Sequence, residues 1–249
     1  MTYCVAIQVN DGLVFASDTR TSAGVDDIRT YSKMHVFEFP GERSLVLLSA
    51  GNLATTHAIL AQMRRDLDNP EASVSLRSAR GMYDVAEYVG GVSTRAQKDT
   101  SVQGQYGGVD LRVTLILGGQ ISGEPPSLYL IYPEGNCIWC SPETPYLQLG
   151  ESKYGKPILD RIIRPEVSLE DAARCALVSL DSTIKSNLSV GPPLDLAILC
   201  RDAFSLARKV RLEPDTSPTE QQGTCPIRNG FSSATHTSQR PFLGQQTTF

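Results

Sequence analysis

The sequence predicts an α+β fold in which two antiparallel sheets stack face to face and helices cover their outer faces, a four-layer α/β/β/α sandwich. The first observation behind this prediction is the order of the expected elements: strands, two helices, strands, one helix and a last pair of strands. The second is composition, because 249 residues with a hydrophobic share of 41% can bury a substantial core. Helices and sheets that are apolar on one side bury that side by stacking in such layers.

Two β-hairpins are expected at the start of the chain. Asp11-Gly12 and Pro40-Gly41 are turn signals, and each separates two runs rich in β-branched and aromatic residues. The four expected strands cover residues 3–9, 13–17, 33–39 and 44–50.

Helical periodicity follows the second hairpin. Apolar residues recur at helical spacing over 52–67 and, less regularly, over 75–94. A third helix is expected at 168–184, where Ser168 suits the N-cap and Glu170 and Asp171 lie in the first turn. The remaining strands are expected at 111–117, 128–132, 137–140, 194–200 and 204–210.

The composition changes near residue 212. Residues 213–249 are rich in Pro, Ser, Thr, Gln and Gly and poor in aliphatic side chains. Such a segment buries too little apolar surface to offset the entropy that ordering it would cost. We therefore expect one folded domain at 1–212 and a disordered tail at 213–249.

Charge and hydropathy argue against several classes of protein. A formal net charge of −4, without a basic block that carries interleaved aromatic residues, argues against nucleic-acid binding. No apolar run approaches the roughly 18 residues of a membrane span, and residues 1–10 lack the basic start of a signal peptide. A cytoplasmic protein without nucleic-acid or membrane partners is expected.

The cysteines are not arranged as a metal site. Cys137 and Cys140 form a CxxC pair, but their flanks predict a strand, in which residues three apart point to opposite faces. The sequence holds no second CxxC, and its three histidines are scattered along the chain. We therefore expect free thiols, no metal and no cofactor.

Thr2, directly after Met1, is the most informative single residue. A small second side chain permits removal of the initiator Met, which would give Thr2 a free α-amine beside its own Oγ. An N-terminal amine can serve as the base that activates a threonine hydroxyl. Downstream, Asp18, Lys33 and Gly51 supply a carboxylate, an ammonium and a backbone-donor turn. Together these residues predict an N-terminal-nucleophile hydrolase.

The same residues, at these separations, resemble the β-type subunits of proteasomes. The matching fragments are the N-terminal Thr, Gly12-x-x-x-Ala16-x-Asp18-x-Arg20, Lys33 and Ala50-Gly51-x-x-Ala54. Residues 2–5, 17–21, 149–155 and 186–193 look closest to the bacterial branch called Anbu, the ancestral β subunit. The resemblance covers residues 2–212 and implies the N-terminal-nucleophile hydrolase sandwich.

The resemblance implies a role for each residue of this set. In the family, the Lys that matches Lys33 points toward the N-terminal Thr and is held by the Asp that matches Asp18. An ammonium there favours the neutral, basic form of the Thr2 amine, and Asp18 offsets the cost of burying the ammonium. Gly51 lies where a strand meets a helix, so its N–H is a candidate oxyanion donor, while a tight turn would also need a Gly. Arg20 is expected mainly to stabilise its loop.

An auxiliary site and a substrate pocket are also implied by the resemblance. In the family, a Ser and an Asp-x-x-Ser group hydrogen-bond the Thr amine. Ser152, Ser186 and Ser189 match these positions, with Ser186 in place of the Asp, and Asp181 is the alternative acid if the helix end is shifted. The pocket for the residue that precedes the scissile bond would be lined by Thr21, Ser49 and Leu53.

The predicted function is therefore that of a threonine-type endopeptidase acting on peptides or unfolded proteins. The family implies a homo-oligomer, as a ring or an open helical turn, with a separate unfoldase as a further candidate partner. One alternative is a non-catalytic scaffold subunit, against which the presence of Thr2 argues. The other is an N-terminal-nucleophile amidase with a non-protein substrate, which the lack of a large substrate domain disfavours.

Overall fold

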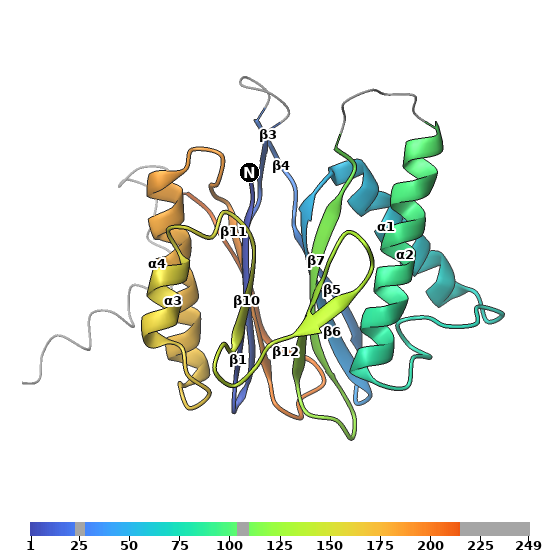
Figure 1. The fold of residues 1–249 in the computed structure, drawn as a ribbon. Helices are drawn as coiled ribbons and strands as arrows, with labels where there is room; N and C mark the ends of the chain where they lie inside the picture. The colour runs from blue at the N-terminus through green and yellow to red at the C-terminus, as the bar shows by residue number, and fades with distance from the viewer. Residues whose placement is uncertain (23–27, 104–109, 215–249) are drawn as a thin grey trace, which may run out of the picture. The chain divides into compact units, whose positions relative to one another are not determined.

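Two β-sheets face each other, and a pair of helices lies on the outer side of each (Figure 1). The computed structural model describes residues 1–22, 28–103 and 110–214. Met1–Glu213 forms one compact unit, and this unit is the predicted four-layer α/β/β/α sandwich. The tail predicted for residues 213–249 lies, from residue 215 on, outside the described residues.

The first sheet carries the N-terminus and is antiparallel throughout, with the strand order β10-β1-β2-β11-β12. Its strands are β1 Tyr3–Val9, β2 Gly12–Asp18, β10 Tyr146–Gly150, β11 Leu194–Cys200 and β12 Leu206–Leu212. Helices α3 (Lys156–Ile162) and α4 (Leu169–Ser186) cover its outer face. Ser168 caps α4 as predicted, because its hydroxyl accepts the Asp171 N–H at 3.1 Å.

The second sheet is also antiparallel and has the order β5-β6-β7-β8-β9. Its strands are β5 Met34–Phe39, β6 Arg43–Gly51, β7 Val113–Ile121, β8 Ser127–Ile131 and β9 Cys137–Trp139. Helices α1 (Leu53–Asp68) and α2 (Met82–Gln103) cover its outer face. A separate two-stranded pair, β3 Arg20–Ser22 and β4 Ile28–Thr30, follows β2.

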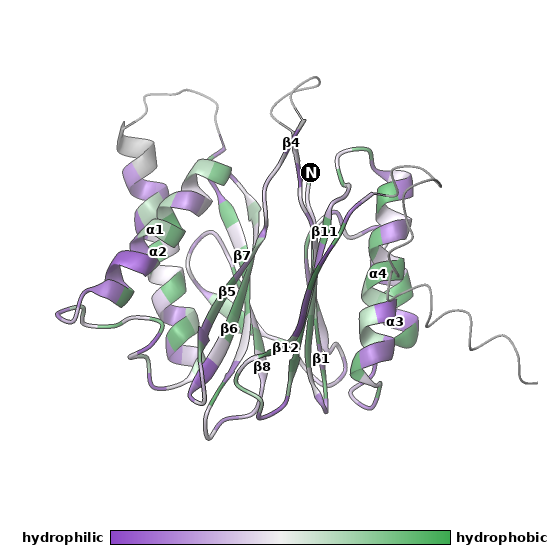
Figure 2. Cartoon of the chain, turned by 180° about the vertical axis from the view of Figure 1, so that it is seen from behind, coloured by the Kyte–Doolittle hydropathy of each residue, from purple (hydrophilic) through white to green (hydrophobic). Residues whose placement is uncertain are grey.

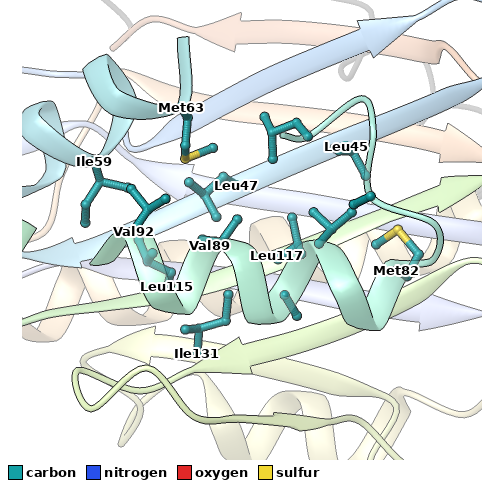
Figure 3. Close-up of a cluster of buried hydrophobic side chains, with 14 of the residues drawn as sticks. Leu45, Leu47, Ile59, Met63, Met82, Val89, Val92, Leu115, Leu117 and Ile131 are labelled. Atoms are coloured by element: carbon teal, nitrogen blue, oxygen red, sulfur yellow. The ribbon is translucent and has the colours of Figure 1, made fainter. Parts of the chain in front are cut away.

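Three apolar clusters fill the spaces between the layers. Figure 3 shows part of the cluster between the second sheet and its helices, where Met63 and Val89 pack with Leu47 and Leu117. A second cluster joins the first sheet to α3 and α4, and a third, which includes Phe15, lies between the sheets. The helices carry both hydrophilic and hydrophobic residues (Figure 2), as expected for a layer with one face in solvent. Burial of this apolar surface is the main favourable contribution to folding.

Four short elements were not predicted: β3, β4, β10 and α3. Each has seven residues or fewer, too few for a hydrophobic period to stand out. Helix α2 begins at Met82 instead of residue 75, because Ser75 and Ser78 exchange side chain–backbone hydrogen bonds that close a turn ahead of it. The prediction also ended this helix too early, at residue 94.

Strand β7 continues to Ile121, beyond its predicted end at residue 117. Gly118 and Gly119 lie inside the strand, and a Cβ atom on either would come within 2.5 Å of Phe15 or of the Ser44 carbonyl. Close packing of neighbouring strands and layers therefore requires these glycines. In the sequence alone, two consecutive glycines indicate that a strand ends before them.

The CxxC pair lies at β9, with Cys137 as its first residue and Cys140 just after its end, and both thiols are free. Within the described ranges, no group of three or more His, Cys, Asp or Glu side chains is placed to hold a metal ion. None of the described helices is long and apolar enough to cross a membrane. Cys225 and His236 lie outside the described residues.

Candidate active site

Strand pairing holds Thr2 at one end of the first sheet. Strand β1 lies between β2 and β10, with Cys4 opposite Ser17 and Tyr3 opposite Gly150. The Tyr3 N–H donates to Asp18 Oδ1 at 3.0 Å, so the residue after Thr2 is tied to the end of β2. Gly150, with φ +79°, packs so closely that a Cβ atom on it would lie 1.8 Å from the Thr2 carbonyl oxygen. Thr2 is therefore fixed by both neighbouring strands.

A buried ion pair joins the two sheets beside Thr2. Lys33 Nζ donates to Asp18 Oδ1 at 2.6 Å and to the Arg20 carbonyl at 2.7 Å. The Lys33 and Asp18 side chains are 8% and 0% exposed. Burial raises the pKa of the Asp18 carboxyl, and the charge of Lys33 with the N–H groups of Tyr3 and Gly191 opposes that rise. Because Asp18 pairs with it, the Lys33 ammonium can be buried away from water. A buried ammonium without such a partner would strongly destabilise the fold.

The candidate nucleophile and five other predicted site residues line one pocket of about 360 Å³. Thr2, Lys33 and Gly51 contribute to it, and so do the three predicted substrate-contacting residues, Thr21, Ser49 and Leu53. Asp18 does not line the pocket, but it contacts Lys33, which does. A larger pocket of about 990 Å³, beside α1 and α2, contains none of the predicted site residues.

Gly51 forms the junction between β6 and α1 and adopts φ +120°. A Cβ atom on Gly51 would lie 2.2 Å from the Arg112 carbonyl oxygen, so the position requires glycine for steric reasons. The next residue, Asn52, caps α1 by accepting the Thr55 N–H at 3.1 Å. The pocket therefore lies beside a helix N-terminus, an end that favours negative charge.

We expect Gly51→Ala to lower the free energy of unfolding by at least about 2 kcal/mol more than Gly41→Ala does. Gly41 is a matched control because it also has a positive φ, +74°, but a Cβ atom there would have no neighbour within 4 Å. Urea unfolding followed by circular dichroism measures both variants. Equal losses would show that the Arg112 carbonyl gives way at no cost and that the turn does not require glycine.

The segment 187–193 packs against the site from the α4 side. Arg20 Nη1 donates to the Leu188 carbonyl at 2.8 Å, and Thr19 Oγ1 donates to the Pro193 carbonyl at 2.7 Å. A Cβ atom on Gly191 would lie 2.4 Å from the Arg20 guanidinium carbon. Arg20 is thus held against the segment 187–193 and also lines the pocket, so its expected role in stabilising the loop stays a prediction.

None of the predicted auxiliary residues lines the pocket. Ser152 is half-buried, and its carbonyl accepts the Lys156 N–H at the start of α3. Ser189 is half-buried, whereas Ser186 is exposed at the end of α4. The alternative acid, Asp181, is 61% exposed and pairs with Lys185 at 2.7 Å along the surface of α4.

Two residues that the sequence reasoning passed over lie closer to Thr2 than these. Gly150 lines the pocket, and the Glu151 N–H donates to the Thr2 carbonyl at 2.8 Å. Glu151 is only 8% exposed. The signal in the sequence is an acid, Glu151, directly after Gly150 in the segment 149–155.

Comparison with known protein families shows which family this chain belongs to. The pattern of the family described as Proteasome subunit matches residues 2–199. The chain belongs to the proteasome subunit family. Among curated members, this proteasome subunit is 24% identical over 217 residues to the proteasome subunit beta of Haloferax volcanii, covering 85% of the chain and 79% of that protein.

Solved structures place this proteasome subunit with the Anbu, or ancestral beta-subunit, proteins. It is 43% identical to Anbu from Yersinia bercovieri, with a TM-score of 0.80 over 98% of this chain and 100% of that one. It is 46% identical to the Anbu of Pseudomonas aeruginosa, described as a helical assembly, with a TM-score of 0.82 over 94% of each chain. The predicted resemblance to this branch is therefore confirmed.

Proposed function

We propose that this chain is a threonine peptidase that hydrolyses peptide bonds with Thr2, after removal of Met1. The observation that carries the proposal is the buried Lys33–Asp18 pair, which lies in contact with the strand end that bears Thr2. Met1 is 63% exposed, so an aminopeptidase can reach the bond that must be cut.

In the proposed reaction Thr2 Oγ attacks the scissile carbonyl carbon while its proton passes to the neutral Thr2 amine. Collapse of the tetrahedral intermediate breaks the C–N bond, and the leaving amine takes up that proton. The product is an ester between the acyl group and Thr2. Water, deprotonated by the same amine, then hydrolyses the ester and regenerates the hydroxyl.

Lys33 would keep the Thr2 amine in the form that accepts a proton. An ammonium about 4 Å from another cation, at an effective dielectric constant near 20, costs about 4 kcal/mol, which disfavours protonation of the amine. Asp18 holds the ammonium in place through the 2.6 Å contact. Because an N-terminal amine has an unperturbed pKa near 7.7–8.0, a modest decrease makes it a base at neutral pH.

Gly51 is the proposed oxyanion donor, since it lines the pocket at the N-terminal end of α1. A preorganised N–H at such a place stabilises the charge that develops on the carbonyl oxygen, typically by about 3–4 kcal/mol. Thr21, Ser49 and Leu53 would surround the residue before the scissile bond. Ser152, Ser186 and Ser189 are the proposed auxiliary residues, although none of them lines the pocket that contains Thr2.

We further propose that the subunit acts as a homo-oligomer in the cytoplasm, as a ring or an open helical turn. The relative from Pseudomonas aeruginosa is described as a helical assembly, which supports the second form. Peptides or unfolded proteins are the proposed substrates, and an unfoldase would be a separate protein.

Intact mass and covalent capture test the function directly. We expect the purified protein to lack Met1 and to gain one equivalent of a β-lactone or an epoxyketone per chain, with the label on Thr2. Denatured protein, in which Thr2 is not positioned, should gain no label. Retention of Met1 by the folded protein, without labelling, would instead support a non-catalytic scaffold subunit. Labelling together with hydrolysis of amides but not of peptides would support the amidase alternative.

A further inference from the structure

Glu151 is a buried carboxylate that the proposed chemistry has not used. It directly follows Gly150, the last residue of β10, and is 8% exposed. Its backbone N–H holds the Thr2 carbonyl at 2.8 Å. The acid that the sequence suggested for the auxiliary site, Asp181, is instead exposed and paired with Lys185. Glu151 is therefore the acid whose own backbone touches the candidate nucleophile residue.

The carboxylate links two loops that are far apart in the sequence. Its Oε1 accepts the Lys153 N–H at 3.0 Å, and its Oε2 accepts Asn187 Nδ2–H at 3.2 Å. The other side of the same amide, Asn187 Oδ1, accepts the Ser189 N–H at 3.0 Å. Asn187 thus connects Glu151 to the segment that carries Ser189 and Gly191.

This segment ends on the buried ion pair. The Gly191 N–H donates to Asp18 Oδ2 at 3.3 Å, on the carboxylate whose other oxygen receives Lys33 and the Tyr3 N–H. A continuous path therefore runs from Glu151 to Asp18. Hydrogen bonds join Glu151 to Asn187 and Asn187 to Ser189, the covalent backbone leads from Ser189 to Gly191, and a last hydrogen bond joins Gly191 to Asp18. Both ends of the path meet the strand end that bears Thr2.

We propose that Glu151 is a positioning residue of the Thr2 site. Its carboxylate orients the Asn187 amide, which holds the segment 187–191 so that Gly191 stays on Asp18. The proposal rests on the proposed function, since it gives Glu151 a part in that reaction without contact with the substrate. Ser189 depends on the same path for its position.

The polarity of the path explains why an acid is needed. Asn187 must donate through Nδ2 and accept through Oδ1, so position 151 must present two acceptors, one to Lys153 and one to Asn187. An amide at position 151 offers one acceptor and one NH₂ group. Either Lys153 or Asn187 then faces a donor, or the Asn187 amide turns over and abandons the Ser189 N–H.

The same logic yields a double variant that restores every hydrogen bond. In Glu151→Gln combined with Asn187→Asp, the new NH₂ group at 151 donates to the new carboxylate at 187. That carboxylate still accepts the Ser189 N–H through its other oxygen. Asn187→Asp alone, by contrast, turns a half-buried carboxylate toward the buried carboxylate of Glu151.

We expect each single variant to lower kcat by about tenfold or more with KM changed less than twofold, because misplaced groups slow the chemical step. The double variant should recover kcat to within about threefold of wild type, a coupling that independent sites do not show. Glu170→Gln is the matched control, since Glu170 is 74% exposed on α4; its kcat should equal that of wild type. A double variant no more active than the product of the two single effects would overturn the proposal, and so would full activity of Glu151→Gln.

Hydrogen exchange separates failure of this inference from failure of the proposed function. We expect backbone amides of 187–191 to exchange faster in Glu151→Gln and to regain wild-type protection in the double variant. If wild-type protein neither hydrolyses nor labels, the peptidase assignment fails, while this exchange pattern still supports the path from Glu151. Unchanged exchange in Glu151→Gln, with an active wild type, would overturn the inference and leave the peptidase assignment intact.

Discussion

Thr2→Ala is expected to reduce peptide hydrolysis to less than about a thousandth of the wild-type rate. The variant removes Oγ, the only proposed nucleophile, and leaves the backbone contacts of Thr2 in place. Those contacts, to the Glu151 N–H and through Tyr3 to Asp18, involve no atom of the Thr2 side chain. The fold should therefore be retained, with an unchanged circular dichroism spectrum.

Two comparisons make this result specific. Thr2→Ser should keep measurable activity and labelling, because both the hydroxyl and the amine remain. Thr144→Ala, at an exposed turn outside the pocket, should behave as wild type. Residual turnover of Thr2→Ala well above a thousandth, in a protein with a normal spectrum, would exclude Thr2 as the nucleophile.

Lys33→Ala is expected to lower kcat/KM by about tenfold or more at pH 7, because an amine at its unperturbed pKa near 7.7–8.0 is about nine-tenths protonated there. Loss of the ammonium raises the pKa of the Thr2 amine, and only the neutral amine acts as the base. The rise of residual activity with pH should therefore move to higher pH. A profile of kcat/KM against pH, compared with that of wild type, measures the shift.

The matched control is Lys185→Ala, which removes a lysine from another Lys–Asp pair of nearly equal length. That pair, with Asp181 at 2.7 Å, is exposed on α4, and its loss should leave kcat/KM within about twofold of wild type. Lys33→Ala leaves Asp18 buried without its partner, at a cost of about 3–5 kcal/mol. If that variant does not fold, the combination Lys33→Met and Asp18→Asn removes both charges and should fold without activity. Full activity of either variant, with an unmoved pH profile, would refute the proposed role of Lys33.

Local patterns were sufficient to predict most of the fold and several residues that the structure places around one pocket. The turn of the first hairpin lies at Asn10-Asp11, with Gly12 already paired to Val9 in β2, and this register brings Asp18 to Tyr3 and so to Thr2. The strand–helix junction at Gly51 is likewise encoded by neighbours in the sequence. These residues could be named because the contacts that place them are made within, or next to, periodic segments.

The rest of the site could not be read in this way. Glu151 and Asn187 are separated by α3 and α4, and they meet only because both helices pack on the first sheet. No period links a residue at the end of a five-residue strand to one after an 18-residue helix. The serines at 152 and 186 drew attention by their type, whereas burial, which only the fold determines, distinguishes Glu151 from Asp181.

The ion pair that crosses between the sheets would make the proposed catalysis depend on how the two sheets are aligned. Asp18 belongs to one sheet and Lys33 leads into the other, while the apolar cluster between the sheets has no directional contacts of comparable precision. A small slide of one sheet over the other would disturb the close packing of Phe15 on Gly118, and it would also separate the charged groups. The rate of the proposed hydrolysis is therefore expected to depend on the alignment of the two sheets.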